Sequence, residues 1–232
     1  MAACEQAGAR VSGLERGARP GVPPAPPLNP KVVRHIVDSA GMRVVPSVQR
    51  GCLLMHSKPG RLPYADSCRV LQDAGLLDAG AIPALPQQPP RHDDEVLGVE
   101  FFRTQLADAK LENLTLPRTF FGRSEIRAVS FRGTDLGEST MCWNDFIDVD
   151  FSGADLVRAD LRASTFERVV FDGADLTGAD LLRSTFNACS WKGAILTKVK
   201  LTTSAARAIP LTADQRGQID LQDSDGPEPE GG

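Results

Sequence analysis

Closely spaced carboxylates between Asp135 and Asp180 are the residues of this 232-residue chain whose types and spacing most clearly suggest a chemical role. This stretch holds eleven acidic and three basic residues, a local net charge of −8, within a chain of net charge −4. Asp135, Asp155 and Asp175 recur every twenty residues, and Asp160 and Asp180 repeat the same interval. Carboxylates held at a regular spacing attract a cationic partner.

Residues suited to catalysis or metal binding are scattered along the chain. The three histidines, His35, His56 and His92, all precede the acidic stretch. The five cysteines show neither metal nor disulfide spacing, and no glycine-rich phosphate loop is present. We therefore expect no catalytic residue, no metal and no cofactor, and a protein that is not an enzyme. The cysteine usage and the lack of a signal-peptide pattern favour the cytoplasm.

A period of five residues must position these carboxylates. Every fifth residue from Phe101 to Leu201 is large and apolar, through twenty-one consecutive units, and the residue two places before each is usually small. Five matches neither the helical period of 3.6 nor the strand period of 2. A fixed repeat indicates a solenoid in which one large and one small side chain of each unit point inward. The other three positions of each unit then face water.

A second period, of twenty residues, predicts the cross-section of this solenoid. Two columns of large residues are aromatic and two are aliphatic, so on consecutive sides each aromatic column faces an aliphatic one and fills a narrow interior. Gly133, Gly153 and Gly173 share the period, which predicts a turn with positive φ. About five coils would make a rod roughly 25 Å long. The predicted core residues are Phe131, Phe151, Phe171, Trp191, Phe146, Phe166, Phe186, Leu136, Leu156, Leu176, Leu161 and Leu181.

Four units, Ala154-Asp155-Leu156, Ala159-Asp160-Leu161, Ala174-Asp175-Leu176 and Ala179-Asp180-Leu181, carry the same Ala-Asp-Leu motif. The pattern resembles the pentapeptide-repeat family, whose consensus is A-(D/N)-L-x-x, over about 105 of the 232 residues. The resemblance implies an all-β fold, a right-handed quadrilateral parallel β-helix with four pentapeptides in each coil. It also implies a function for the carboxylates, because several members mimic B-form DNA and bind type II topoisomerases.

Two functions are open for such a rod. The first is a non-enzymatic, protein-binding interaction scaffold. The alternative, which the resemblance implies, is a DNA mimic that binds DNA gyrase or topoisomerase IV and modulates it or protects it from topoisomerase poisons, giving antibiotic resistance. We expect a protein partner, no direct nucleic-acid binding, no membrane contact, and a monomer or weak dimer. The candidate partner-binding carboxylates are Asp135, Asp155, Asp175, Asp160, Asp180, Asp148, Asp172 and Glu167.

Structural alternatives compete with both surface hypotheses. Seven of the eleven acids occupy the consensus Asp/Asn position, where an aspartate can accept hydrogen bonds from turn backbone. Trp143 is a candidate exposed aromatic contact, since it falls outside the inward positions. Phe102 and Phe120 also fall outside these positions. The N-terminal segment or an irregular first coil could instead cover all three aromatic side chains.

Composition divides the chain into four parts. Residues 1–95 are proline-rich, and we expect them to be mostly disordered with short helices near Pro30–Ala40 and Tyr64–Leu77, or to form a small element that binds a partner or caps the array. Residues 96–205 form the predicted β-helix. Residues 206–219 form a C-terminal cap in which Thr212 begins a short helix. Residues 220–232 are predicted to be a disordered acidic tail.

Overall fold

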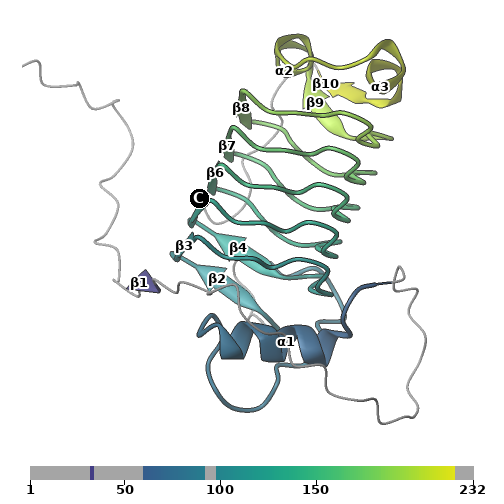
Figure 1. The fold of residues 1–232 in the computed structure, drawn as a ribbon. Coiled ribbons are helices and arrows are strands. Elements are labelled where there is room, and N and C mark those ends of the chain that lie inside the picture. Colours follow the sequence, from purple (N-terminus) through teal and green to yellow (C-terminus); the bar gives the residue numbers. More distant parts are fainter. Residues whose placement is uncertain (1–31, 34–59, 92–97, 223–232) are drawn as a thin grey trace, which may run out of the picture.

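The computed structural model describes residues 32–33, 60–91 and 98–222, and the array within it is a parallel β-solenoid (Figure 1). Along one side, each strand pairs in parallel with the strand of the next coil at an offset of twenty residues, as Ile126 does with Phe146. This arrangement confirms the solenoid with a twenty-residue coil that the two periods predict, and the parallel β-fold that the resemblance implies. The stacked strands are β3 (Gln105–Ala107), β5 (Glu125–Arg127), β6 (Asp145–Ile147), β7 (Thr165–Glu167) and β8 (Thr185–Asn187).

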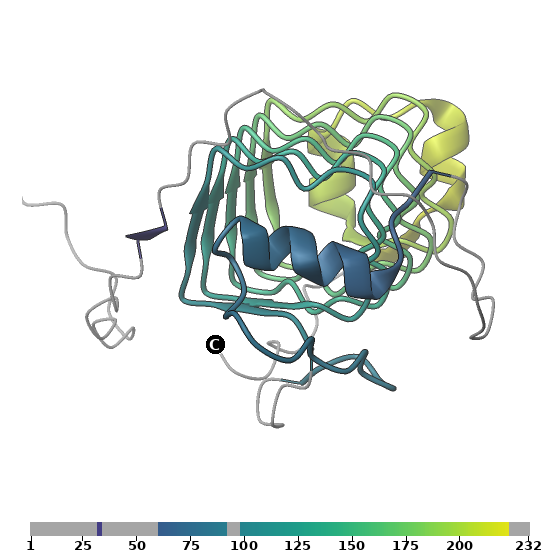
Figure 2. The same ribbon diagram turned by 60° about the horizontal axis from the view of Figure 1, so that its bottom comes forward.

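The other sides of the rod are held by shorter contacts. β2 (Glu100–Phe102) pairs in parallel with β4 (Phe120–Gly122), and single bridges continue the pairing along the remaining coils. Between these contacts the chain turns sharply in every pentapeptide. Viewed toward its N-terminal end, the stack of coils has a roughly square outline (Figure 2).

Each unit turns at the residue two places after its large side chain, and this residue has positive φ. Gly133, Gly153 and Gly173 have φ of 64°, 63° and 68°, as the twenty-residue period predicts. The same conformation occurs where the residue is not glycine, for example at Trp143 (φ 59°) and Arg158 (φ 56°). A left-handed residue costs roughly 1–2 kcal/mol without glycine. The hydrogen bonds between coils offset this cost, so the turn does not depend on a glycine.

The interior is filled by stacked side chains in the predicted columns. Phe131, Phe151, Phe171 and Trp191 stack with successive ring centroids 5.3, 5.6 and 4.4 Å apart. The neighbouring aromatic column meets this one edge to face, as Phe146 does with Phe151 at 5.7 Å. All the predicted core side chains are buried except Phe186, which is partly buried near the C-terminal end.

A buried polar column lies at the corner that precedes the stacked strands. Asn144 Nδ2 donates to the Phe121 carbonyl at 3.0 Å, and Asn144 Oδ1 accepts from the Ser124 amide N–H at 2.9 Å. These bonds satisfy backbone groups that have no partner in the adjacent coil. Ser124, Ser164 and Ser184 do the same in the other coils. Asn144 occupies the inward position that is usually small, two places before Phe146, and it makes the same hydrogen bonds as these serines.

The N-terminal end of the array is covered by α1 (Tyr64–Asp73), which lies across the coils in Figure 2. Cys68 and Leu71 of α1 are fully buried, and Ser67 Oγ accepts from the Thr115 amide N–H at 2.9 Å. Part of the segment expected to be mostly disordered is thus packed on the array as a cap. The other short helix considered, near Pro30–Ala40, lies outside the described residues except at β1 (Val32–Val33), which pairs with β3.

Residues that follow α1 reach the side of the first coils. Arg118 Nη1 donates to the Pro86 carbonyl at 2.8 Å, and Thr140 Oγ1 donates to the Pro90 carbonyl at 2.6 Å. Phe120 is buried on this side and lies 6.1 Å from Phe102, measured between ring centroids. The burial of Phe120 fits the alternative in which this side chain is covered by the protein itself, whereas Phe102 is only partly buried.

The C-terminal end is covered by two helices and a final strand. After β9 (Lys200–Thr202) come α2 (Thr203–Ala208) and α3 (Ala213–Gln218), and a capping box between Thr212 and Gln215 begins α3. Gln215 Nε2 also donates to the Trp191 carbonyl at 2.7 Å, which ties α3 to the last coils. β10 (Asp220–Gln222) pairs in parallel with β9. The predicted disordered tail thus begins with a strand, because the last coil offers an unpaired edge; residues 223–232 lie outside the described residues.

We predict that Asn144→Ala destabilises the fold and that Asn144→Ser is tolerated. Alanine leaves the Ser124 N–H and the Phe121 carbonyl buried without a partner, which costs about 1–3 kcal/mol for each group. Serine restores the side chain found one coil earlier and one coil later. Urea unfolding of the two variants measures the difference, and equal stability of Asn144→Ala and the unmodified protein would contradict the role of the polar column.

Candidate interaction surfaces

Two sets of aspartates lie in register on two sides of the rod, and we call each set a ladder. The first ladder consists of Asp135, Asp155 and Asp175, and the second of Asp160 and Asp180. Single bridges join Asp135 to Asp155 and Asp155 to Asp175, and another joins Asp160 to Asp180. In each, Oδ1 accepts a hydrogen bond from the amide N–H two residues later, at 3.0 to 3.2 Å. One oxygen of every ladder aspartate therefore stabilises its own turn. This is the structural role expected of an aspartate at the consensus Asp/Asn position.

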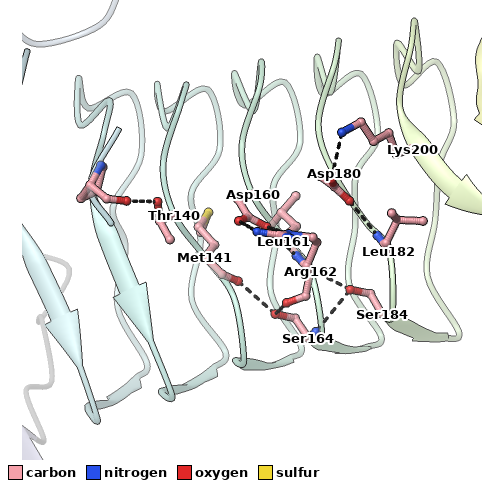
Figure 3. A network of polar contacts seen from close by, with 11 residues as sticks. Thr140, Met141, Asp160, Leu161, Arg162, Ser164, Asp180, Leu182, Ser184 and Lys200 are labelled. Carbon is pink, nitrogen blue, oxygen red and sulfur yellow. Dashed lines mark hydrogen bonds and ion pairs between the residues drawn. The ribbon is translucent and has the colours of Figure 1, made fainter. Parts of the chain in front are cut away.

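Basic side chains of the array pair with the second ladder. Arg162 Nε and Nη2 donate to Asp160 Oδ1 and Oδ2 at 2.8 and 2.7 Å, and Lys200 Nζ lies 3.3 Å from Asp180 Oδ2 (Figure 3). The hydrogen bonds to Asp160 raise the pKa of the Arg162 guanidinium. This side of the rod is therefore largely neutralised.

The first ladder receives a cation from the N-terminal segment. Arg61 Nη1 lies 3.7 Å from Asp135 Oδ2 and 3.6 Å from Asp155 Oδ2, and Arg61 Nε donates to the Gly133 carbonyl at 2.6 Å. The Arg61 side chain is only 4% exposed. The sequence predicts a cationic partner for this ladder but does not identify it as Arg61, because no periodicity connects Arg61 to the array.

The other candidate carboxylates lie outside the two ladders and also have partners. Arg168 donates to Asp148 Oδ1 and Oδ2 at 2.6 and 2.8 Å and also contacts Glu167. The hydrogen bonds from Arg168 lower the pKa of Asp148. Asp172 accepts from the Ser190 hydroxyl and, at 2.9 Å, from the Lys192 amide N–H. The structure thus brings the two ladders into register but places these three carboxylates elsewhere on the rod.

Glu138 is the centre of an ion-pair network along one corner of the rod, which was not among the predicted sites. Arg118 Nε donates to Glu138 Oε2 at 2.7 Å, and Arg158 Nη2 donates to Glu138 Oε1 from the next coil. Burial alone would raise the pKa of Glu138, but the hydrogen bonds from the two arginines outweigh it and the pKa is lowered. Arg118, Glu138 and Arg158 lie twenty residues apart in the sequence, and this spacing could have predicted the network.

A more accessible surface lies on the outer face of β5, β6 and β7, along one side of the rod in Figure 1. Asp145 of β6 is exposed, Ile147 of β6 is partly exposed, and Trp143 is half-buried at the corner just before this strand. Trp143 Nε1 is buried and has no hydrogen-bond partner among the described residues, so the accessible part of this side chain is its apolar ring. The side chains at this strand combine aromatic, aliphatic and acidic character.

The cysteines in the described ranges are unpaired thiols. Cys68 and Cys142 are buried and Cys189 is partly buried. Burial raises the pKa of the Cys142 thiol, and the neighbouring Asp160 carboxylate raises it further, which disfavours the reactive thiolate. In the same ranges, no three His, Cys, Asp or Glu residues group as metal ligands. No helix described there is long and apolar enough to cross a membrane.

Comparison with protein families and solved structures gives a consistent result. The family model described as pentapeptide repeats matches residues 145–183 in eight copies. Similar solved structures include a pentapeptide repeat protein from the cyanobacterium Cyanothece 51142, with 16% identity, covering 42% of this chain and 82% of that chain at a TM-score of 0.36. Another is a pentapeptide repeat protein of the Arabidopsis thaliana thylakoid lumen, with 31% identity, covering 49% and 72% at a TM-score of 0.26.

A third similar structure is full-length QnrB1, described as a plasmid-mediated fluoroquinolone resistance protein. It has 15% identity, and the match covers 53% of this chain and 94% of that chain at a TM-score of 0.18. None of the curated proteins matches the chain.

We predict that Glu138→Gln lowers the stability of the fold at neutral pH by about 1–2 kcal/mol, because it removes charge-assisted hydrogen bonds. The lowered pKa means that the ionised carboxylate stabilises the fold above the unfolded-state value of about 4.3. This contribution is lost as the pH falls through the lower folded-state value, so the two proteins should converge in acid.

Thermal unfolding between pH 7 and pH 3 tests this expectation. The matched control is Glu125→Gln, because Glu125 pairs with Arg127 at an exposed site where an ion pair contributes about 0–1 kcal/mol. A stability loss in Glu138→Gln that does not change with pH would show that the carboxylate charge is not responsible.

Proposed function

Because this chain belongs to the pentapeptide-repeat family, we propose that it is a non-enzymatic scaffold that binds a protein partner through the outer face of β5, β6 and β7. We name this surface, centred on Trp143, Asp145 and Ile147, the β6 face. The rigid solenoid holds these side chains in fixed positions. Binding surfaces built on regular structure lose little conformational freedom on association.

The observation that supports this proposal is the combination of partly or fully exposed side chains on β6 and at the corner just before it. Aromatic residues contribute disproportionately to protein interfaces, and an adjacent aliphatic side chain enlarges the apolar contact. Asp145 is exposed beside them and adds a charge that would select a partner with a basic group nearby. The ladder aspartates are weaker candidates for the main contact, because they are hydrogen-bonded within the rod and largely paired with basic side chains.

We predict that Trp143→Ala weakens capture of the partner at least about tenfold, equivalent to about 1.4 kcal/mol, without unfolding the array. Alanine occupies the same left-handed corner position at Ala128 and Ala163, so the turn should tolerate it. The measurement is a quantitative pull-down with the full chain, followed by titration of the captured protein. Ile195→Ala is the control, because Ile195 is 44% exposed on a different side of the rod. Unchanged capture by folded Trp143→Ala would reject the β6 face.

The second candidate function is DNA mimicry directed at DNA gyrase or topoisomerase IV, with protection from topoisomerase poisons and hence antibiotic resistance. The regular register of Asp135, Asp155 and Asp175 favours it, because a phosphate-binding surface can accept evenly spaced carboxylates. QnrB1, one of the similar structures, is a fluoroquinolone resistance protein by its description. The ion pairs of Arg61, Arg162 and Lys200 with the ladders reduce the negative charge that such mimicry requires.

A supercoiling assay with purified gyrase, with and without a poison, tests this second function. If the chain is a DNA mimic, it should alter supercoiling at micromolar concentration, and the double variant Asp155→Asn with Asp175→Asn should weaken the effect. Added salt should weaken it too, because exposed charges are screened beyond about 10 Å at 0.1 M ionic strength. Folded protein without any effect on gyrase would discard DNA mimicry and leave the scaffold proposal standing.

A further inference from the structure

The contact of Arg61 with the first ladder shows how the rod holds an arginine. Its Nε donates to a corner carbonyl, that of Gly133, and its Nη1 lies between the carboxylates of two successive coils, Asp135 and Asp155. The side chain is 96% buried, and its Nη2 has no hydrogen-bond partner among the described residues. A buried guanidinium with one unsatisfied nitrogen is retained there because the carbonyl and the two carboxylates compensate its charge.

The solenoid repeats this arrangement one coil further along. A shift of twenty residues converts Gly133, Asp135 and Asp155 into Gly153, Asp155 and Asp175. The backbone is equivalent in the two registers, because Gly133 and Gly153 have φ of 64° and 63° and both aspartate pairs are joined by parallel bridges. The chain therefore carries the same three acceptors in a second register.

The second register has free acceptors and open space. Asp175 Oδ1 accepts from the amide N–H and the hydroxyl of Thr177, at 3.0 and 2.6 Å, whereas Asp175 Oδ2 has no hydrogen bond within the described ranges. The Gly153 carbonyl likewise accepts none there. A Cβ added at Gly153 would meet no atom within 4 Å, whereas one added at Gly133 would meet Asn113. A side chain from another molecule can approach the rod at this corner.

We propose that the Gly153 carbonyl, Asp155 and Asp175 form a binding site for an arginine side chain of a partner protein. We call it the second arginine site. Arginine suits these acceptors better than lysine, because its planar fork presents several N–H donors at once and so reaches a carbonyl and two carboxylates together. The site lies on a different side of the rod from the β6 face, and it does not depend on the function proposed for that face.

Asp155 belongs to both registers, so its carboxylate is not available to the second site alone. Its Oδ2 lies 3.6 Å from Arg61 Nη1, so a second guanidinium shares this carboxylate with Arg61. Asp175 and the Gly153 carbonyl belong to the second site alone. Substitution at Asp175 therefore removes the second site and leaves the Arg61 contact intact.

The test uses the full chain and two blocked tripeptides, acetyl-Gly-Arg-Leu-amide and acetyl-Gly-Lys-Leu-amide, titrated to millimolar concentration and followed by amide chemical shifts. The arginine peptide reproduces residues 60–62. It should bind saturably and shift the resonances of Gly153, Asp155 and Asp175. The lysine peptide should bind at least about fivefold more weakly, because it lacks the fork.

Asp175→Asn should weaken binding of the arginine peptide at least about fivefold, because it removes a charge-assisted hydrogen bond. Asparagine keeps an Oδ1 acceptor for the turn, and thermal unfolding checks that the variant is folded. Asp180→Asn is the matched control on the neighbouring side and should bind as the unmodified protein does. Gly153→Arg provides a second variant, since Arg158 occupies the equivalent corner position in the next unit, and it should abolish binding by filling the site.

The proposal is overturned by any of three results. The first is that the arginine peptide gives no saturable shift. The second is that the lysine peptide binds as tightly, which would mean general attraction of cations. The third is that Asp175→Asn and Gly153→Arg, both folded, bind as the control does.

Discussion

Hydrogen bonds between successive coils are the constraint on which the rest of this structure depends. They join residues that are nineteen to twenty-one positions apart in the sequence. Examples are the bond from the Phe131 N–H to the Asp150 carbonyl at 2.8 Å and the bond from the Asp150 N–H to the Val129 carbonyl at 3.0 Å. This register places every side chain about 4.8 Å from its equivalent in the next coil. Like residues therefore stack on like residues. Aromatic rings gain contact from this stacking, whereas carboxylates repel one another and need hydrogen bonds or cations.

The hydrogen bonds and ion pairs of the stacked carboxylates explain why a count of acidic residues overstates the negative charge on the surface of the rod. Each ladder aspartate uses one oxygen to stabilise its turn, and Arg61, Arg162 and Lys200 pair with the ladders. These basic residues come from three parts of the chain: the N-terminal segment, the same unit, and the last coil. The acidic stretch between Asp135 and Asp180 is thus mostly neutralised within the protein, and the more accessible chemistry lies on the β6 face and at the second arginine site.

Both ends of the array need elements that the repeat itself cannot provide. A coil in the middle is covered by its neighbours, but an end coil exposes its interior and its unpaired backbone groups. α1 covers the first coil with Cys68 and Leu71, and at the other end α3 holds the last coils through Gln215. The cap segment that carries α1 also carries Arg61, so the covering of the end and the neutralisation of the ladder come from one stretch of chain.

The sequence by itself determined the solenoid, its inward columns, the glycine corners and the register of the ladders, because all of these follow from periods of five and twenty residues. The tertiary structure alone decided the contact of Arg61, the packing of α1, the pairing of β10 and the burial of Phe120. Arg61 donates to the carbonyl of a residue 72 positions away, and it stands outside the repeat. A periodic pattern specifies partners only for residues that share its register, so contacts made by the rest of the chain depend on how its folded surface meets the rod.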